Sequence, residues 1–461
     1  MRTVSARPRS STTLNASAQA PDSSWRNWDG RQRCTPAAFA RPASLEQLRE
    51  VLARAQEAGH GVRVAGSGHS FTGLVLTEGT LVSLERMGRV LEVDRARGLV
   101  RVQAGITLRE LNLALHRHGL ALENLGDVDR QSIAGATATG THGTGAQLRN
   151  ISAQLQAVQL MCADGSILEL DQESDPDAWR AARVSLGALG VVSALTLRVV
   201  PAFRLRAHDG PMPLDRALEQ LDALVAEHDH FELYWFPYAE QALLRRNDRS
   251  FEPAVPRGAV RTYMDDVLLV NHGLGALCRL GRRHPRLIPQ LNRLVTRLAG
   301  SSTRLDDSFR VFVSPRLVRF TEMEYAIPRE RAAQAIREVR ELLHQQRLPV
   351  SFPIEVRFVA ADDALLSPAH GRDSCYIAVH VFDQMAYEPY FREVEAIMDR
   401  HDGRPHWGKR HFQTAQTLAP RYPEWERFAQ VRARLDPEGL FANAELERVL
   451  GPVKGPGGAL D

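Results

Sequence analysis

The sequence predicts an α+β protein that is built from more than one domain. The chain has 461 residues, which is longer than one hydrophobic core normally organises. Strand-like segments recur at about 80–105, 155–200 and 231–236, and two well-marked amphipathic helices accompany the first of them. From residue 329 the order is helix, strand, strand, helix, which is typical of helices on one face of an antiparallel sheet.

The chain begins with a polar tail and an amphipathic helix. Residues 1–24 are rich in Ser, Thr and Arg and lack the apolar centre of a signal peptide, so a disordered tail is favoured over a leader. Residues 44–58 predict a helix that ends at Gly59, with Ser44 and Gln47 as a capping box. Its inward face consists of Leu45, Leu48, Leu52 and Ala55. A second helix is predicted from Thr107, with Glu110 completing its capping box, to Gly119.

Two glycine-rich segments are the first functional signal. Residues 62–73, VRVAGSGHSFTG, predict a strand that enters a turn. A dinucleotide fingerprint requires a third glycine where Phe71 stands, and no amphipathic helix follows, so a Rossmann site is disfavoured. An anion-binding turn and an ordinary tight turn both remain open.

The second segment is residues 132–145, SIAGATATGTHGTG, in which only Ile133 and His142 are large. This density of small residues excludes a packed helix or a normal strand and indicates that a flat or extended ligand presses against backbone. A small-residue core crossing is the alternative. Because the two segments carry one histidine each, His69 and His142, a shared ligand is favoured.

Charged residues near the C-terminus suggest a second kind of chemistry. Glu355 and Arg357 share one face of a predicted strand, where they could orient a polyhydroxylated substrate or simply pair on a solvated surface. Lys409 suits a cation that faces developing negative charge, with a surface basic cluster as the alternative. The spacing of His401, His406 and His411 matches no common ligand set, so no metal is predicted.

Composition excludes several classes of protein. The net charge is +3 and arginines are scattered, so no nucleic-acid partner is expected. Four widely separated cysteines argue against iron–sulfur and Cys-rich zinc sites and fit a reducing compartment, which predicts a cytoplasmic protein. No apolar run reaches eighteen residues, so no integral membrane segment is expected, although association with a membrane surface stays open. Residues 247–290 show little periodicity and are expected to form a loop-like region.

Six collinear blocks carry a resemblance to a known family. They are VRVAGSGHSFT (62–72), ENLGDVDRQSIAGATATGTHGTG (123–145), SLGALGVVSALTL (185–197), FTEMEYAIPRE (320–330), EVRFVAADDALLSPAHGRD (355–373) and RPHWGK (404–409). The sequence resembles the aldonolactone oxidase group (L-gulono-1,4-lactone and D-arabinono-1,4-lactone oxidases) of the vanillyl-alcohol-oxidase (VAO)-type flavoproteins, with alditol oxidase as a cousin. The resemblance covers about residues 25–450.

The resemblance implies a two-domain FAD-binding fold of the VAO/PCMH type with an α+β substrate (cap) domain. The FAD-binding domain would cover residues 25–205 and the substrate domain residues 206–425. A C-terminal segment, 426–452, would pack on the FAD domain, and residues 453–461 would form a disordered tail.

The resemblance also implies the cofactor residues. FAD would be held by Val64, Ala65, Gly66, Ser67, Gly68, His69, Ser70, Gly126, Asp127, Ser132, Gly135, Thr139, Gly140, Thr141, His142, Val192 and His406. In many members the residue matching His69 is bonded covalently to the flavin, so a covalent link is a prediction here. Glycine at position 126 would leave a path for oxygen and favour an oxidase. Asp127 stands where alditol oxidase has serine, which favours a lactone over a polyol.

The implied reaction is oxidation of a sugar lactone at its C2 hydroxyl by hydride transfer to flavin N5. Glu355 and Arg357 would bind the hydroxyl, and Lys409 would place positive charge beside the flavin. The electron acceptor would be O2 or a cytochrome c-like protein. An alditol oxidase is the alternative within the family, and a flavin-free carbohydrate-binding protein is the alternative outside it.

Overall fold

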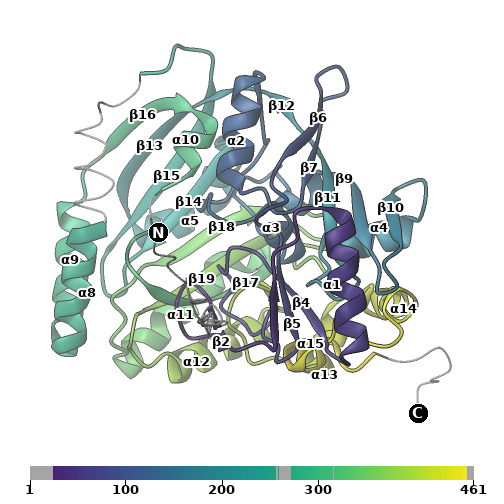
Figure 1. Ribbon diagram of the computed structural model, residues 1–461. Helices are drawn as coiled ribbons and strands as arrows, with labels where there is room; N and C mark the ends of the chain where they lie inside the picture. Colours follow the sequence, from purple (N-terminus) through teal and green to yellow (C-terminus); the bar gives the residue numbers. More distant parts are fainter. Residues whose placement is uncertain (1–23, 256–257, 259–270, 315, 454–461) are drawn as a thin grey trace, which may run out of the picture.

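The computed structural model describes residues 24–255, 258, 271–314 and 316–453, so the tails predicted at 1–24 and 453–461 fall almost entirely outside the described residues. Sheets and helices are interleaved along the whole chain, and Figure 1 shows the early strands and the later large sheet side by side. Among the described residues, none of the helices is both long and apolar enough to span a bilayer.

Besides the two-stranded pairs β1 (Trp25–Arg26) with β2 (Arg33–Cys34) and β8 (Leu120–Ala121) with β12 (Val200–Pro201), two main sheets form the N-terminal part of the molecule. The smaller is parallel, in the order β3-β5-β4, and α1 (Leu45–Glu57) buries Leu48 and Leu52 in the core beside it. The larger is antiparallel, in the order β10-β9-β11-β7-β6. Their strands are β3 (Ala38–Ala40), β4 (Val62–Ala65), β5 (Thr80–Ser83), β6 (Val90–Asp94), β7 (Leu99–Gln103), β9 (Leu155–Met161), β10 (Ile167–Asp171) and β11 (Val191–Arg198).

The predicted helix starts are confirmed, with one difference in detail. The helix α2 (Leu108–Arg117) has a full capping box between Thr107 and Glu110. The Ser44 hydroxyl accepts a hydrogen bond from Gln47 N at 3.3 Å, but the Gln47 side chain accepts from Ala43 N instead of Ser44 N. The cap of α1 is therefore present without the reciprocal bond of a capping box.

The C-terminal part contains one antiparallel sheet in the order β16-β13-β15-β14-β18-β19-β17-β20. Its strands are β13 (Arg204–Pro213), β14 (His230–Trp235), β15 (Gln241–Ser250), β16 (Ser302–Asp307), β17 (Phe320–Pro328), β18 (Ile354–Val359), β19 (Ser374–Phe382) and β20 (Arg404–Pro405). The helices α5 (Leu214–Glu219), α6 (Leu221–Glu227), α11 (Ala332–Gln346) and α12 (Glu388–Arg400) contribute to one apolar core with it.

The two faces of this sheet differ in polarity because successive side chains on a strand alternate between faces. Met323, Tyr325, Ile354 and Val356 point into the core under the helices. Charged or polar residues of β14, β17, β18 and β19 alternate with such core residues and lie on the opposite face, toward the N-terminal part of the chain. These residues are Glu232, Tyr234, Glu322, Glu324, Glu355, Arg357 and His380.

The end of the chain returns to the N-terminal part. The helices α14 (Trp425–Leu435) and α15 (Ala444–Leu450) place Phe428 and Leu446 in the core around β7, β9 and β11. Val62 N donates to Leu440 O at 2.8 Å, which adds this segment to the edge of β4. The domain limits at 205 and 426 remain a proposal, which this arrangement supports.

Two expectations from the sequence are wrong. Residues 132–145 include the helix α3 (Ile133–Ala138), because the Ser132 hydroxyl caps it by accepting from Gly135 N at 3.4 Å. Residues 256–257 and 259–270 of the loop expected at 247–290 lie outside the described residues, and the described remainder contains the helix α8 (Leu274–Arg283) and the start of α9 (Ile288–Leu298). Glycine occupies two inward positions of α8, Gly275 and Gly281. Large apolar residues are therefore missing from positions where the sequence of an amphipathic helix would normally show them.

Candidate cofactor and active site

The two glycine-rich segments line one cavity of about 330 Å³. The turn after β4 forms one wall, and α3 with the residues before and after it forms another. A cofactor role was predicted for the following lining residues: Val64, Ala65, Gly66, Ser67, Gly68, His69, Ser70, Ser132, Gly135, Thr139 and Val192. The structure therefore brings together eleven of the seventeen residues that were expected to hold the cofactor, and His69 is among them. His142, the histidine of the second glycine-rich segment, does not line this cavity.

The small residues of this cavity are required by close approach. A Cβ atom at Gly66 would lie 2.4 Å from Ser132 Oγ, so any side chain there would collide with the start of α3. Gly68 has a φ of +72°, which favours glycine. Backbone and small side chains thus line the cavity beside the turn, and this fits an extended, flat cofactor with a phosphate-containing arm.

His69 is held in the turn at the side of the cavity. Its ring is stacked with Trp28 at a centroid separation of 6.3 Å. Burial, together with the positive charge of Lys409, lowers the pKa of His69 to about 4. The imidazole is therefore neutral at physiological pH, which leaves one ring nitrogen with a lone pair that can act as a nucleophile.

A second cavity of about 80 Å³ adjoins the first, and Gln131 lines both. It lies between the polar face of the large sheet and the loops of the N-terminal part. Eight residues predicted from the sequence line it: Gly126, Asp127, Thr141, His142, Glu355, Arg357, His406 and Lys409. Gly140 lines neither of these two cavities; it has a φ of +73° in the turn that ends α3.

A network of opposite charges crosses the second cavity. Arg357 forms an ion pair with Glu355 on its own strand, and its guanidinium also lies 3.2 Å from Glu232 Oε2 and 3.4 Å from Asp127 Oδ2. Arg316 donates to the Asp127 carboxylate from Nε at 3.0 Å. Burial raises the carboxyl pKa of Asp127, but Arg316 and Arg357 outweigh it and hold that pKa well below its usual range.

Lys409 faces two buried carboxylates of β17. It forms an ion pair with Glu322 and lies 4.0 Å from Glu324 Oε2. His380 Nε2 approaches the other oxygen of Glu322 at 3.4 Å. Burial raises the pKa of Glu322, but Lys409 and His380 outweigh it and lower the pKa to about 2. Lys409 is accordingly held as an ammonium inside the cavity. The alternative interpretation, in which Lys409 belongs to a basic cluster on the surface, is wrong.

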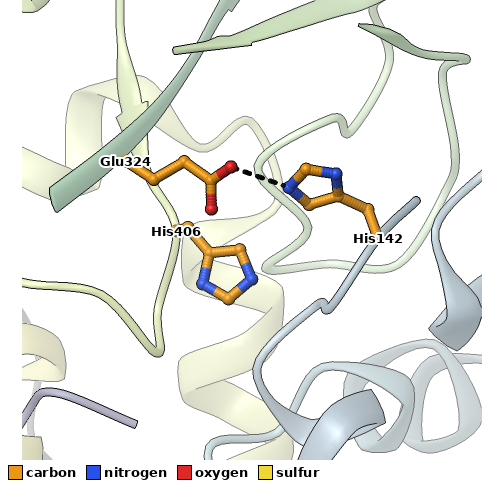
Figure 2. A group of neighbouring side chains, drawn as sticks. All are labelled: His142, Glu324 and His406. Carbon is orange, nitrogen blue, oxygen red and sulfur yellow. Dashed lines mark ion pairs between the residues drawn. The ribbon is translucent and has the colours of Figure 1, made fainter. Parts of the chain in front are cut away.

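Figure 2 shows a neighbouring group formed by His142, Glu324 and His406, whose ligand atoms all lie within 4.8 Å of one another. Such a group could hold a metal ion. However, His142 Nδ1 contacts the Gly143 carbonyl at 2.8 Å while Nε2 contacts Glu324 at 3.2 Å, so both ring nitrogens face acceptors.

His406 Nδ1 accepts from Gly408 N at 3.0 Å, which leaves the proton of the neutral ring on Nε2. A metal ligand must present a lone pair, so these hydrogen bonds disfavour a metal, and its absence stays a prediction. His401 and His411 do not join His406: His401 pairs with Glu338 at 3.0 Å.

Val128, Gln131 and Phe320 line the second cavity without having been predicted. Reasoning from the sequence also missed five ionisable residues of this cavity or its charge network: Glu232, Arg316, Glu322, Glu324 and His380. Four of these five residues could have been predicted, because each alternates with apolar neighbours on a strand. A charged residue in such a position must face a polar environment. Arg316 lies in a loop, and no periodic pattern could have placed it.

The chain matches the family model for D-arabinono-1,4-lactone oxidase over residues 195–449 and the model for an FAD binding domain over residues 36–171. An L-gulono-1,4-lactone dehydrogenase of Mycobacterium tuberculosis is 51% identical over 93% of this chain and 99% of that protein. The L-gulonolactone oxidase of Mus musculus is 34% identical over 92% of this chain and 98% of that protein. An alditol oxidase of a Streptomyces species is 32% identical, with coverage of 92% and 98%.

Among solved structures, a single-residue mutant of cholesterol oxidase from Brevibacterium sterolicum resembles this chain with a TM-score of 0.80. The alignment covers 93% of this chain and 97% of that chain, at 18% sequence identity. This likeness shows the fold alone, which is the VAO-type FAD-binding fold that the sequence predicted.

Proposed function

The chain belongs to the D-arabinono-1,4-lactone oxidase family of FAD-dependent oxidoreductases that act on CH–OH groups, and we propose that it oxidises an aldono-1,4-lactone at the C2 hydroxyl. The observation that carries this proposal is the placement of Glu355, Arg357 and Lys409 in one small cavity beside the larger one. L-Gulono-, L-galactono- and D-arabinono-1,4-lactone are the proposed substrates.

The larger cavity would hold the FAD. Residues 64–70 and the start of α3 would offer backbone N–H groups to the pyrophosphate, and the side chains of Val192 and Thr139 would lie beside the rest of the cofactor. When bound, FAD supplies the acceptor for the hydride that leaves the substrate carbon. Neutral His69 would be the point of covalent attachment.

The second cavity would hold the lactone. Arg357 would donate hydrogen bonds to the reacting hydroxyl oxygen and to the adjacent oxygen of the substrate, because its guanidinium carries five N–H donors. Three carboxylates already hold the plane of this guanidinium in place. Glu355 would be the proton acceptor: burial raises its carboxyl pKa and, together with the charge of Asp127, outweighs the lowering effect of Arg357. A carboxylate with a raised pKa accepts a proton more readily, so Glu355 would accept the hydroxyl proton.

Lys409 would supply fixed positive charge where negative charge develops. Burial lowers its pKa, but Glu322 and Glu324 outweigh it, so the ammonium persists in the cavity. His406 stays neutral, because burial lowers its pKa to about 3, and its Nε2–H is free to donate. These two groups would stabilise the electron-rich product state.

Both O2 and a cytochrome c-like protein remain proposed electron acceptors. Glycine at position 126 does not decide between them. A Cβ atom there would lie 3.0 Å from the His142 carbonyl oxygen, so close packing alone accounts for the glycine.

Anaerobic reduction of the purified holoenzyme tests the substrate. We expect the flavin absorbance at about 450 nm to bleach with one of the three lactones much faster than with xylitol or sorbitol. Bleaching by the polyols alone would replace the lactone with an alditol. The reduced enzyme is then mixed with O2 or with cytochrome c, and the faster reoxidation identifies the acceptor class.

A further inference from the structure

Tyr234 and Glu355 face each other across two neighbouring strands of the large sheet. The strands β14 and β18 lie side by side (Figure 1), and their register places Tyr234 opposite Glu355. Two residues along the same strands, Glu232 stands opposite Arg357. The side chains of directly opposite residues on one face of an antiparallel pair lie close enough to interact. The register therefore sets a tyrosine hydroxyl beside the proposed proton acceptor.

The Tyr234 hydroxyl lies between two carboxylates. It donates to Glu232 Oε2 at 2.5 Å, and its oxygen lies 3.4 Å from Glu355 Oε1. A hydroxyl carries a single proton, and the shorter of the two contacts takes it. The oxygen of Tyr234 therefore presents a lone pair to Glu355 and no proton.

The two carboxylates differ in their affinity for a proton. Burial raises the carboxyl pKa of Glu232, but Arg357 and Arg245 outweigh it and hold that pKa below its usual value. The carboxyl pKa of Glu355 is raised instead, because burial and the charge of Asp127 prevail there. Neighbouring groups whose pKa values are pushed apart take different parts in a proton transfer. Glu232 is thus the anion that keeps the tyrosine proton, and Glu355 is the group that gains a proton.

We propose that Tyr234 is a positioning residue that favours the protonated form of Glu355, an inference that rests on the proposed function. When Glu355 takes the proton of the substrate hydroxyl, the O–H bond of the substrate breaks and an O–H bond forms on the carboxylate. The new carboxylic acid donates to the Tyr234 oxygen, so a lone pair that opposed the carboxylate becomes a hydrogen-bond acceptor for the acid. The proton of Tyr234 itself stays in place, held by Glu232.

Other groups also act on Glu355 and remain unchanged when only the Tyr234 hydroxyl is removed. On β19 the cross-strand neighbour of Glu355 is the uncharged Ala378. The charged and titratable groups are Arg357 on its own strand, Glu232 on β14, Arg316 at 3.9 Å from its Oε2, Asp127 in the N-terminal part, and His380, two positions beyond Ala378. A change of Tyr234 to phenylalanine therefore isolates the contribution of one oxygen.

The pH profile of flavin reduction in Tyr234→Phe tests this proposal. The rate rises with pH as Glu355 ionises, because a general base must be unprotonated to accept a proton. Without the Tyr234 oxygen the acid form of Glu355 loses its acceptor, so this rising limb moves to lower pH by at least about 0.5 unit, or about threefold in proton affinity. The falling limb, which belongs to Lys409, stays in place. A rising limb that moves to higher pH shows that Tyr234 donates to the carboxylate and overturns the proposal, as does an unshifted limb.

The matched control is Tyr238→Phe, whose lost hydroxyl donates to the Leu343 carbonyl at 3.0 Å and does not line the cavity. It moves neither limb of the profile. The flavin absorbance and melting temperature of each variant establish that it is folded.

Infrared titration of the oxidised holoenzyme measures Glu355 without any substrate. The C=O band of its carboxylic acid, identified by its loss in Glu355→Gln, appears at lower pH in Tyr234→Phe than in the parent enzyme. A band that titrates at the same or at a higher pH contradicts the role of Tyr234. If none of the three lactones reduces the flavin, the proposed function fails, and this titration still decides whether Tyr234 favours the protonated form of Glu355.

Discussion

Lys409 depends on its carboxylate neighbours for its charge. Burial in the small cavity opposes the ammonium form, and the adjacent Glu322 and Glu324 more than compensate. Asp127 adds a weaker attraction from the opposite wall, while His380 faces Glu322 from the neighbouring strand β19. The charge of one catalytic candidate is thus set by residues of three separate elements.

Glu322→Gln tests this dependence. Removing the carboxylate lowers the pKa of Lys409, so the rate of flavin reduction by the lactone declines at a lower pH than in the parent enzyme. Stopped-flow reduction across a pH series measures the shift, and Glu322→Asp restores most of it. The control Glu338→Gln removes a carboxylate that pairs with His401 away from the cavity, and leaves the profile unchanged. A uniform loss of rate with an unshifted profile would make Glu322 a structural residue only.

Lys409→Met tests the charge itself. Methionine keeps much of the length of the side chain but removes the cation, so we expect the flavin-reduction rate to fall by at least about 100-fold. The variant retains its flavin, because Lys409 lines only the smaller cavity. A rate near that of the parent enzyme removes Lys409 from the mechanism.

His69→Ala tests the covalent bond to the cofactor. Since burial keeps the ring neutral, with a pKa of about 4, the nucleophilic form predominates above that pH. After denaturation, flavin is expected to stay with the parent polypeptide and to separate from the variant. Free flavin from the parent polypeptide would show that His69 only lines the cavity beside Trp28.

The turn after β4 and the start of α3 act as one unit at the scale of secondary structure. Gly66→Ala places a Cβ atom against Ser132 Oγ and pushes the two walls of the larger cavity apart. We expect the affinity for FAD to fall by at least about tenfold, measured by titration of the apoprotein, with a smaller loss of stability. Gly300→Ala is the control, since a Cβ atom there meets nothing within 4 Å. Equal FAD affinity in both variants would contradict the close packing.

Elements with a clear amphipathic period and a capping signal could be predicted from the sequence, and α2 with its Thr107–Glu110 box is an example. The strand with Glu355 and Arg357 was also predictable, because alternation fixes which side chains share a face. The helix α8 could not be predicted, since glycines occupy two of its inward positions. The pairing of Arg316 with Asp127 joins residues 189 positions apart through a loop, and no local pattern encodes it.

At the scale of the whole molecule, the site exists because the large sheet has two unlike faces. Its apolar face is covered by its own helices, and its polar face closes against the loops that hold the larger cavity. The C-terminal segment after residue 426 packs on the N-terminal part that contains these loops. Asn443 is the clearest contact: its amide donates to the carbonyls of Gly73, Leu74 and Leu76, and its oxygen caps α15.

Asn443→Ala tests whether the packing of the C-terminal segment on the N-terminal part supports the cofactor cavity. The substitution removes the cap of α15 and the donor to the Leu76 carbonyl, while the carbonyls of Gly73 and Leu74 keep Leu76 N and Arg63 Nε as donors. We expect the free energy of unfolding to fall by about 2–4 kcal/mol. The affinity for FAD falls with it, because these carbonyls directly follow the turn at residues 66–70. Ser44→Ala is the matched control: it removes the side-chain cap of α1, does not line the larger cavity, and costs about 1 kcal/mol. Urea unfolding and FAD titration measure both effects, and a loss no larger than that of the control would mean that the C-terminal segment packs on the N-terminal part without shaping its cavity.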